Sequence, residues 1–348
     1  MTGDKPQSDA LREALSISSE LLRCSFGISY LDDALLGMAP GEITLMGART
    51  GGGKTEFATQ VVLQQQNEDS KKAKSVLYFA LDHEPDEIYN RLTWRLLTQQ
   101  LKKIEEPKIK GMYLRYAEWM AGKYRGLFDD LETDARNYLK LLFETSNTHF
   151  LYRKNQLTID DITEIISDDS SAEHNLFIID HFHAIKGIDS LEKQTEAMTK
   201  ISEAAEKIFR PVLVLGQFRK RSSNNRSPIP DMEEFSGSAQ LIYIPQNIIV
   251  LAPRQTEGAE LWETYFHIVK SRIASDSKVF VGVHSFDMEL KKYSDRYQIM
   301  RHVPYAEPNE IIAAKIPKWA KRCFIVQSAL EAIQKPFTPS YKPYKDDE

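Results

Sequence analysis

Short apolar runs alternate with helical segments along most of the chain. Segments with helical spacing lie at 56–66, 158–166 and Leu191–Ile208. Strands that alternate with helices predict a mostly parallel sheet covered by helices on both faces, so we expect an α/β fold. The runs with the length and composition of strands are 42–46, 75–81, His149–Tyr152, 176–179, 212–215, 247–251 and 265–269.

The remaining segments add helices and one hairpin. The long, charged stretch 86–147 is predicted to form helices that cover the edge of the sheet, and residues 279–293 to form a late antiparallel hairpin. Amphipathic spacing predicts further helices at 9–24 and 309–333, the second followed by a flexible tail rich in Pro, Lys and Tyr. The chain then divides into three parts. Residues 1–24 form an N-terminal tail with a linker-like helix, residues 25–303 form the core, and residues 304–348 form a C-terminal helix with its tail.

Composition is that of a soluble globular protein. The 348 residues are 42% hydrophobic and 27% charged, and no apolar stretch approaches the roughly 20 residues that span a bilayer. The N-terminus is polar and lacks the apolar core of a signal peptide, which predicts a cytoplasmic protein without a membrane anchor. Cys24 and Cys323 do not have metal-ligand spacing. The formal net charge of -5 argues against a protein that coats polyanions, although a local basic patch can still bind nucleic acid.

A glycine-rich loop between a predicted strand and a predicted helix matches the phosphate-binding P-loop, with Ala in place of the first Gly. The glycines let successive backbone N–H groups face a phosphate, the lysine reaches the β- and γ-phosphates, and the final hydroxyl can hold Mg²⁺. A turn that merely joins strand and helix is the alternative, but the order of elements favours a site for ATP and Mg²⁺. The loop consists of Ala48, Arg49, Thr50, Gly51, Gly52, Gly53, Lys54 and Thr55.

Polar residues follow three other predicted strands. Asp180 ends the run 176–179 and is the candidate Walker B carboxylate, which would act on the Mg²⁺ shell; an ordinary strand-ending Asp is the alternative. Asp82 and Glu84 follow the run 75–81, where one of them could orient the attacking water, although acidic residues also favour the first turn of a helix. Gln217 follows residues 212–216 and could sense the γ-phosphate.

An ordered set of motifs then resembles the DnaB-type replicative helicases and other RecA-like ATPases. Residues 26–32, Phe-Gly-Ile-Ser-Tyr-Leu-Asp, look like the segment that precedes the motor in that family, and residues 48–55 resemble its P-loop. Asp82 stands where the family has its catalytic Glu, and Gln217 falls on its sensor position. The segment Ile-Asp-His at 179–181 is similar to the Walker B of the Twinkle-type and phage helicases, and Gly-Ser at 237–238 with the strand 248–251 resembles the end of the core.

The resemblance implies a ring, usually a hexamer, with ATP at the subunit interfaces. Lys270 and Arg272 match the family's Lys-x-Arg, which a neighbouring subunit inserts as an arginine finger. The helix at 9–24 would be similar to the linker helix that docks on the next subunit, or it would pack on its own domain. Single-stranded DNA would pass through the central channel.

A polar loop after Gln217 is the candidate DNA contact, because several cations on a loop can follow a phosphate backbone without reading sequence. A solvated surface loop is the alternative. The cations proposed to contact DNA are Arg219, Lys220, Arg221 and Arg226.

Two departures from the family bear on function. Asp82 is one methylene shorter than the family's Glu, and the acidic Glu233 and Glu234 stand where the family often has a basic residue. The leading hypothesis is a ring-forming, ATP-driven helicase or translocase on single-stranded DNA, with a possible replication protein partner, that serves replication of a phage, plasmid or mobile element. The alternative is a RecA-like ATPase switch that works through a protein partner, as a helicase loader, recombination mediator or regulatory ATPase. A small-molecule kinase lacks support, since no lid-like Arg cluster follows the Walker B strand.

Overall fold

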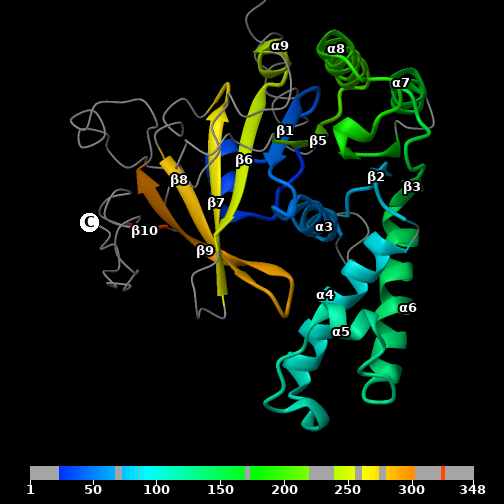
Figure 1. Cartoon of the computed structure of the whole chain (residues 1–348), viewed down its shortest axis with the longest axis vertical. Helices are drawn as coiled ribbons and strands as arrows, with labels where there is room; N and C mark the ends of the chain where they lie inside the picture. The colour runs from blue at the N-terminus through cyan, green and yellow to red at the C-terminus, as the bar shows by residue number, and fades with distance from the viewer. Residues whose placement is uncertain are drawn as a thin grey trace, which may run out of the picture.

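The computed structural model forms one mixed sheet of ten strands covered by helices (Figure 1). The strand order is β10-β9-β8-β7-β6-β1-β5-β4-β2-β3. The structure describes residues 23–66, 73–84, 86–168, 173–218, 239–254, 261–273, 280–301 and 323–325. Most of the predicted helices at 9–24 and 309–333 therefore lie outside the described residues, as do Arg219, Lys220, Arg221, Arg226, Glu233, Glu234 and residues 237–238.

Six strands pair in parallel and confirm the predicted α/β fold. Each is an apolar run predicted from the sequence, because strands covered on both faces are apolar throughout. The carboxyl ends of these parallel strands meet at one edge of the sheet. The strands are β1 (Ile43–Ala48), β2 (Val76–Ala80), β3 (His149–Tyr152), β4 (Leu176–Asp180), β5 (Val212–Gln217) and β6 (Asn247–Arg254).

An antiparallel half continues the sheet beyond β6. Strand β7 (Leu261–Lys270) runs back along β6, and β8 (Phe280–Asp287) and β9 (Lys292–Arg301) form the predicted late hairpin, which extends further than expected. Strand β10 (Cys323–Ile325) pairs in parallel with β9. The predicted helix at 309–333 is therefore wrong at residues 323–325, which form a strand. Short apolar runs fit either helix or strand, and here the unpaired edge of β9 supplies a hydrogen-bonding partner.

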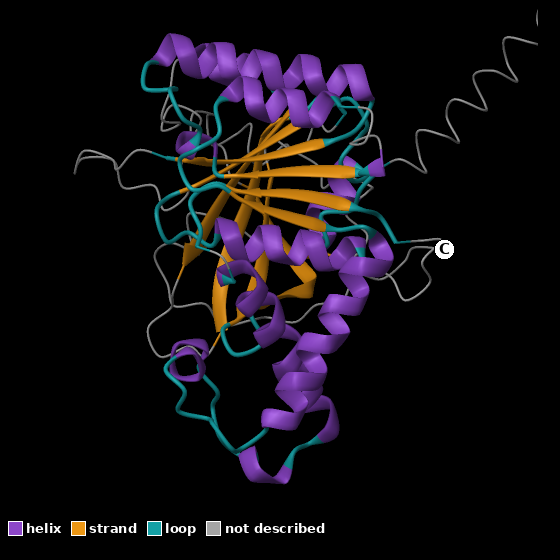
Figure 2. Ribbon diagram, turned by 90° about the vertical axis from the view of Figure 1, so that its right-hand side faces the viewer, coloured by secondary structure: helices purple, strands orange, loops and turns teal. Residues whose placement is uncertain are grey.

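Helices cover both faces of the sheet (Figure 2). Alternate residues of β1 show why: Met46 belongs to one buried cluster and Leu45 to the other. The first cluster includes residues of α2 (Ser29–Leu35) and α3 (Lys54–Gln65), whereas the second includes residues of α7 (Ile159–Ser167) and α8 (Leu191–Ile208). A short 3-10 helix, η3 (Phe182–Ala184), follows β4, and α9 (Ala239–Tyr243) precedes β6.

The stretch 86–147 forms a helical extension that projects from the sheet (Figure 1). Its base packs on the sheet, where Ile88 and Leu139 join the first buried cluster. Further out, the Trp94 indole donates a 2.9 Å hydrogen bond to the carbonyl of Glu289, beside the hairpin of β8 and β9. Trp94, Trp119 and Tyr124 also form part of a core of the extension's own, which the sequence did not predict. The elements are α4 (Glu87–Ile104), the 3-10 helix η1 (Pro107–Ile109), α5 (Tyr116–Met120) and α6 (Asp129–Ser146).

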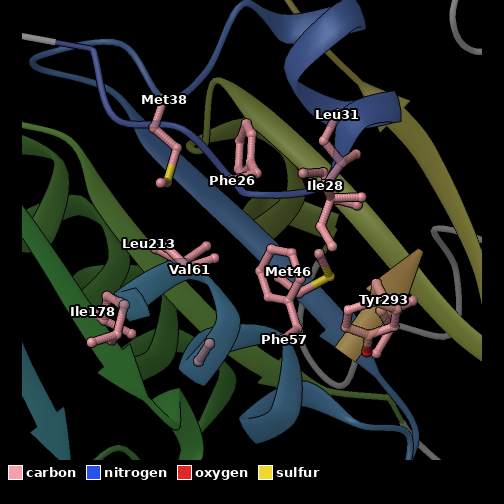
Figure 3. Packing of buried hydrophobic residues seen from close by; sticks show 14 of the residues in the cluster. Phe26, Ile28, Leu31, Met38, Met46, Phe57, Val61, Ile178, Leu213 and Tyr293 are labelled. Carbon is pink, nitrogen blue, oxygen red and sulfur yellow. The ribbon is translucent and has the colours of Figure 1, made fainter. Parts of the chain in front are cut away.

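The segment before β1 is fixed by one carboxylate. Asp32 accepts hydrogen bonds from the backbone N–H groups of Phe26 and Gly27 at 2.7 and 3.0 Å. This turn places Phe26 and Ile28 in the core beside Phe57 of α3 (Figure 3). The pattern of residues 26–32 thus has a structural cause in this chain, because the partly buried carboxylate satisfies backbone donors that would otherwise be unpaired.

Among the residues that the structure describes, no helix is both long and apolar enough to cross a membrane.

Candidate nucleotide site

A cavity of about 420 Å³ opens at the carboxyl ends of the parallel strands, where ligands of open α/β sheets bind. The P-loop forms one wall, and the hairpin of β8 and β9 reaches over from the antiparallel half to form another. The cavity is lined by Thr50, Gly51, Gly52, Gly53, Lys54, Thr55, Glu56, Asp82, His83, Arg91, Asp180, His181, Gln217, Pro253, Trp262, Thr264, Phe286, Met288, Lys291 and Tyr293.

The P-loop turns from β1 into α3 through left-handed backbone conformations. Gly51 has φ +72° and Gly53 has φ +85°, values that L-residues with a Cβ rarely adopt. A Cβ at Gly51 would meet nothing within 4 Å, so this part of the loop faces open space. Lys54 begins α3, and its pKa is lowered by burial, an effect that the charges of Asp180 and Asp82 oppose.

The Asp180 carboxylate lies at the end of β4 and is 1% exposed. Its Oδ2 atom accepts a hydrogen bond from the Tyr78 hydroxyl at 2.6 Å and one from the Thr55 hydroxyl at 3.3 Å. Burial alone would raise the pKa of Asp180, but hydrogen bonds from His83 and Tyr78 lower it below its usual value. The carboxylate is therefore ionised and joined to the P-loop.

His83 joins the same cluster, although the sequence did not single it out. Its Nε2 atom lies 3.0 Å from Oδ2 of Asp180, and its Nδ1 atom lies 3.2 Å from a carboxylate oxygen of Glu87. Burial lowers the pKa of His83, but the hydrogen bonds and charges of these two carboxylates outweigh burial and raise it. The only signal in the sequence was its place between Asp82 and Glu84.

The two acidic candidates after β2 separate in space. Asp82 lines the cavity, with Oδ2 at 3.3 Å from Nε2 of His181, whereas Glu84 does not line it and forms a 2.7 Å ion pair with Lys154. Both Glu84 and Lys154 are exposed, with side-chain accessibilities of 69% and 47%. Asp82 is accordingly the better placed of the two for chemistry at the P-loop.

Gln217 lies at the end of β5, beside the P-loop. Its Nε2 atom donates a 2.6 Å hydrogen bond to the hydroxyl of Thr50. The side chain therefore connects the loop that follows β5 with the phosphate-binding loop.

Lys270 and Arg272 lie away from this cavity. Strand β7 begins beside it, where Trp262 and Thr264 line the cavity, and ends with Lys270 paired to Ile248 near the start of β6. The Lys270 ammonium donates hydrogen bonds to the carbonyls of Ile242 and Tyr243 in α9, at 3.0 and 2.6 Å, and Arg272 is exposed. The structure therefore does not bring this pair together with the P-loop of the same chain.

Aromatic and charged residues of the antiparallel half also contribute to the cavity. Trp262, Phe286 and Tyr293 line it together with Lys291, and none of them was a candidate from the sequence. Glu56 of α3 also lines the cavity and forms ion pairs with Arg91 and Arg95 of α4. These ion pairs tie the helix that begins at the P-loop to the helical extension.

The residues present fit a Mg²⁺–nucleotide complex. A hydroxyl and a carboxylate 3.3 Å apart are hard oxygen donors, of the kind that Mg²⁺ prefers in sites completed by phosphates and water. Within the described part of the chain, no group of three or more His, Cys, Asp or Glu side chains could hold a metal ion alone. Thr55 and Asp180 would hold Mg²⁺, and the loop of residues 50–54 would bind the phosphates.

Fold and cavity together define a RecA-like α/β core whose P-loop fits a Mg²⁺–nucleotide complex. The chain matches the model of the DnaB-like helicase C terminal domain over residues 24–272, which is more than half of its length. It therefore belongs to the DnaB-like helicase C-terminal domain family, and the resemblance seen in the sequence is confirmed.

Individual relatives agree with this assignment. The replicative DNA helicase DnaB of Mycoplasma genitalium is 24% identical over 276 residues, which are 75% of this chain and 54% of that protein. The chain thus spans about half the length of this curated relative. A solved ATPase domain aligns with 84% of this chain and 99% of its own, with TM-score 0.64 and 17% identity. A solved DnaB-like replicative helicase, described with its interactions with primase, aligns with 84% of this chain and 66% of its own, with TM-score 0.63 and 16% identity. At these identities the two structures support the fold.

Proposed function

We propose that this chain is the motor of a ring-forming helicase or translocase that uses ATP to move along single-stranded DNA. In this proposal it serves replication of a phage, plasmid or mobile element, with a further replication protein as a partner. Family membership supports the helicase activity, and the cavity supports the use of ATP.

Each residue of the cavity has a distinct task in this proposal. Lys54 and the backbone of the P-loop bind the phosphates, and Thr55 and Asp180 hold Mg²⁺. The ion would neutralise charge that develops on the phosphates. Asp82 orients the attacking water, and Gln217 senses the γ-phosphate. The loop after Gln217, with Arg219, Lys220, Arg221 and Arg226, contacts DNA.

The observation that supports the proposed ring is the direction of β7. From Thr264, which lines the cavity, to Lys270 the strand runs for six residues, or about 20 Å at the usual rise of a strand. Arg272 follows at the opposite edge of the sheet and is exposed, so it is presented to another subunit rather than to its own P-loop. A head-to-tail arrangement that closes on itself gives a ring, in which each Arg272 completes the site of a neighbour.

Asp82 favours the second candidate function, a nucleotide-dependent switch that acts through a protein partner. Its carboxylate is one methylene shorter than that of Glu and lies 3.3 Å from His181. Both features would slow hydrolysis and prolong the ATP-bound state. Such a switch would act as a helicase loader, recombination mediator or regulatory ATPase.

The decisive experiment is steady-state ATPase activity with and without single-stranded DNA, together with the mass of the protein in solution. Strong stimulation and a mass near six subunits support the helicase motor. A monomer or dimer whose slow turnover ignores DNA contradicts it and favours the switch.

A further inference from the structure

The far end of the helical extension is basic. We call residues 102–125 the basic tip; they run from the end of α4 through η1 and α5. The segment contains seven Lys and Arg residues and three Glu residues, whereas the whole chain has a formal net charge of -5. The outer part of this segment lies at the lower end of the extension in Figure 1, whereas its first residue, Lys102, lies 3.8 Å from Asp287 of β8. The tip is therefore basic although the whole chain is acidic.

Much of this charge is available to a ligand. Lys103, Lys110 and Arg125 are exposed, and they form no ion pair with any residue in the described ranges. In contrast, Lys102 pairs with Glu289 at 2.7 Å and Lys123 with Glu118 at 3.0 Å. Three cations without an ion-pair partner among the described residues can neutralise an external anion without losing an ion pair seen there.

Exposed apolar side chains are interleaved with these cations. Tyr113 is 52% exposed, and the other members are Ile104, Met112 and Met120. Each lies within three positions of a Lys or Arg in the sequence. Cations alternating with an exposed aromatic ring are typical of surfaces that bind single strands, because the cations follow the phosphates and the ring stacks on a base.

A packed scaffold supports this surface. Beneath it, Trp94, Trp119 and Tyr124 belong to the extension's own core. The Tyr124 hydroxyl donates a 2.6 Å hydrogen bond to Glu118, and the indole of Trp119 donates one of 2.8 Å to Glu132. The exposed groups are thus held on a preformed surface, which reduces the entropy lost on binding.

We propose that the basic tip is a second site for single-stranded DNA, separate from the loop after β5. Lys103, Lys110 and Arg125 contact phosphates, and Tyr113 stacks on a base. No residue of the tip lines the nucleotide cavity, so the site holds a segment of strand outside the catalytic centre. The choice of DNA rests on the proposed function, whereas the affinity for a polyanion rests on the tip alone. Along the sequence its cations alternate with exposed apolar side chains, a pattern that favours a nucleic acid over a folded acidic partner.

The test is binding of fluorescein-labelled oligothymidine, followed by fluorescence anisotropy over a series of NaCl concentrations without nucleotide. The triple variant Lys103→Gln, Lys110→Gln and Arg125→Gln should bind more weakly. Its slope of log affinity against log salt should be smaller by about 2, since each lost phosphate contact removes about 0.7 from the slope for single strands. Tyr113→Ala should weaken binding about tenfold, and Tyr113→Phe should restore it, because the ring and not the hydroxyl stacks on a base.

A matched control removes three exposed lysines elsewhere: Lys140→Gln, Lys186→Gln and Lys207→Gln. It carries the same charge change as the triple variant and should bind like the wild type. Equal losses in both variants would overturn the proposal, since binding would then depend on total charge. Unchanged binding in the triple variant would also overturn it and would favour an acidic protein as the ligand of the tip.

ATPase activity separates this proposal from the proposed function. Tip-dependent binding without any stimulation of ATPase by DNA would support the second site and contradict the helicase motor. Stimulated ATPase with a tip variant that binds normally would leave the motor intact and reject the second site.

Discussion

The hydroxyl of Tyr78 lies 2.6 Å from Oδ2 of Asp180, so a side chain in the middle of β2 holds the carboxylate at the end of β4. Tyr78 is fully buried. Through this hydrogen bond, the strand that precedes Asp82 also fixes the orientation of the carboxylate proposed to act on Mg²⁺.

Tyr78→Phe should lower both stability and affinity for Mg²⁺–nucleotide. A buried hydrogen bond to a charged group contributes about 2 kcal/mol, which urea unfolding would measure. Affinity for a fluorescent nucleotide should fall with Mg²⁺ and change little without it. Tyr89→Phe is the control, because it removes a 2.7 Å hydrogen bond to the carbonyl of Arg136, away from the site. Equal effects of the two variants on Mg²⁺ dependence would count against the role of Tyr78.

Asp82→Asn should slow ATP hydrolysis by about 10²-fold or more and leave nucleotide binding intact, because a neutral amide cannot act as the base for the attacking water. Single-turnover hydrolysis and nucleotide titration measure the two effects separately. Glu84→Gln removes a charge two residues away that pairs with Lys154 at the surface, and it should leave both quantities unchanged. If the Glu84 variant is the slower enzyme, the assignment of the base must be reversed.

Two inactive variants should restore activity when they are mixed. Lys54→Ala removes phosphate binding, and Arg272→Ala removes stabilisation of the transition state, an effect of about 10³-fold or more. In an equal mixture that assembles at random, about a quarter of the interfaces combine an intact P-loop with an intact finger. ATPase activity of the mixture should rise to that level. A mixture that stays inactive while rings form would argue that Arg272 does not act between subunits.

Gly282→Ala should be among the most destabilising single substitutions in the sheet. A Cβ built at Gly282 would lie 2.1 Å from the ring of Tyr30, which packs directly on the backbone of β8. The backbone or the ring must move, and overpacking of this kind typically costs 1–3 kcal/mol or more, with about 3 kcal/mol expected here. Thermal or urea unfolding measures it. The double variant Gly282→Ala with Tyr30→Ala should lose much less free energy of unfolding than the sum of the losses in the two single variants. If the two losses simply add, the clash with Tyr30 is not the cause.

His284 should make the protein less stable in mild acid. Burial lowers its pKa to about 4, and its Nδ1 atom lies 2.8 Å from the carbonyl oxygen of Ser294. In the unfolded chain this ring binds a proton below about pH 6.5, while in the folded chain it stays neutral until about pH 4. The free energy of unfolding is therefore unaffected by this group above pH 6.5. It decreases as the pH falls towards 4, by about 3 kcal/mol in all. Urea unfolding of wild type and His284→Gln across this range should show a shallower pH dependence in the variant. Parallel curves would exclude His284 as the cause.

The sequence predicted the parallel half of the sheet well, because each of its strands is a continuous apolar run flanked by helical periodicity. The strand His149–Tyr152 and the helix Leu191–Ile208 have the predicted bounds. The P-loop and the residues at strand ends were also accessible to sequence reasoning, since carboxyl ends of parallel strands must meet at one edge.

What the sequence did not reveal depends on contacts between distant segments. His83 became part of the site only because β2 and β4 are neighbours, which brings it to 3.0 Å from Asp180. Trp262, Phe286 and Tyr293 reach the cavity because the antiparallel strands fold back beside the P-loop. Pairing of β10 with β9 joins residues more than twenty positions apart, and no local pattern encodes such a partner.

The direction of β7 has a kinetic consequence. In the proposed ring, a lone chain carries the two halves of a reaction centre on opposite edges of one sheet, so it can bind ATP but cannot consume it efficiently. Turnover per chain should then rise with protein concentration until assembly is complete. Dilution would dissociate the ring and lower the ATPase activity, so free subunits would hydrolyse little ATP until they assemble.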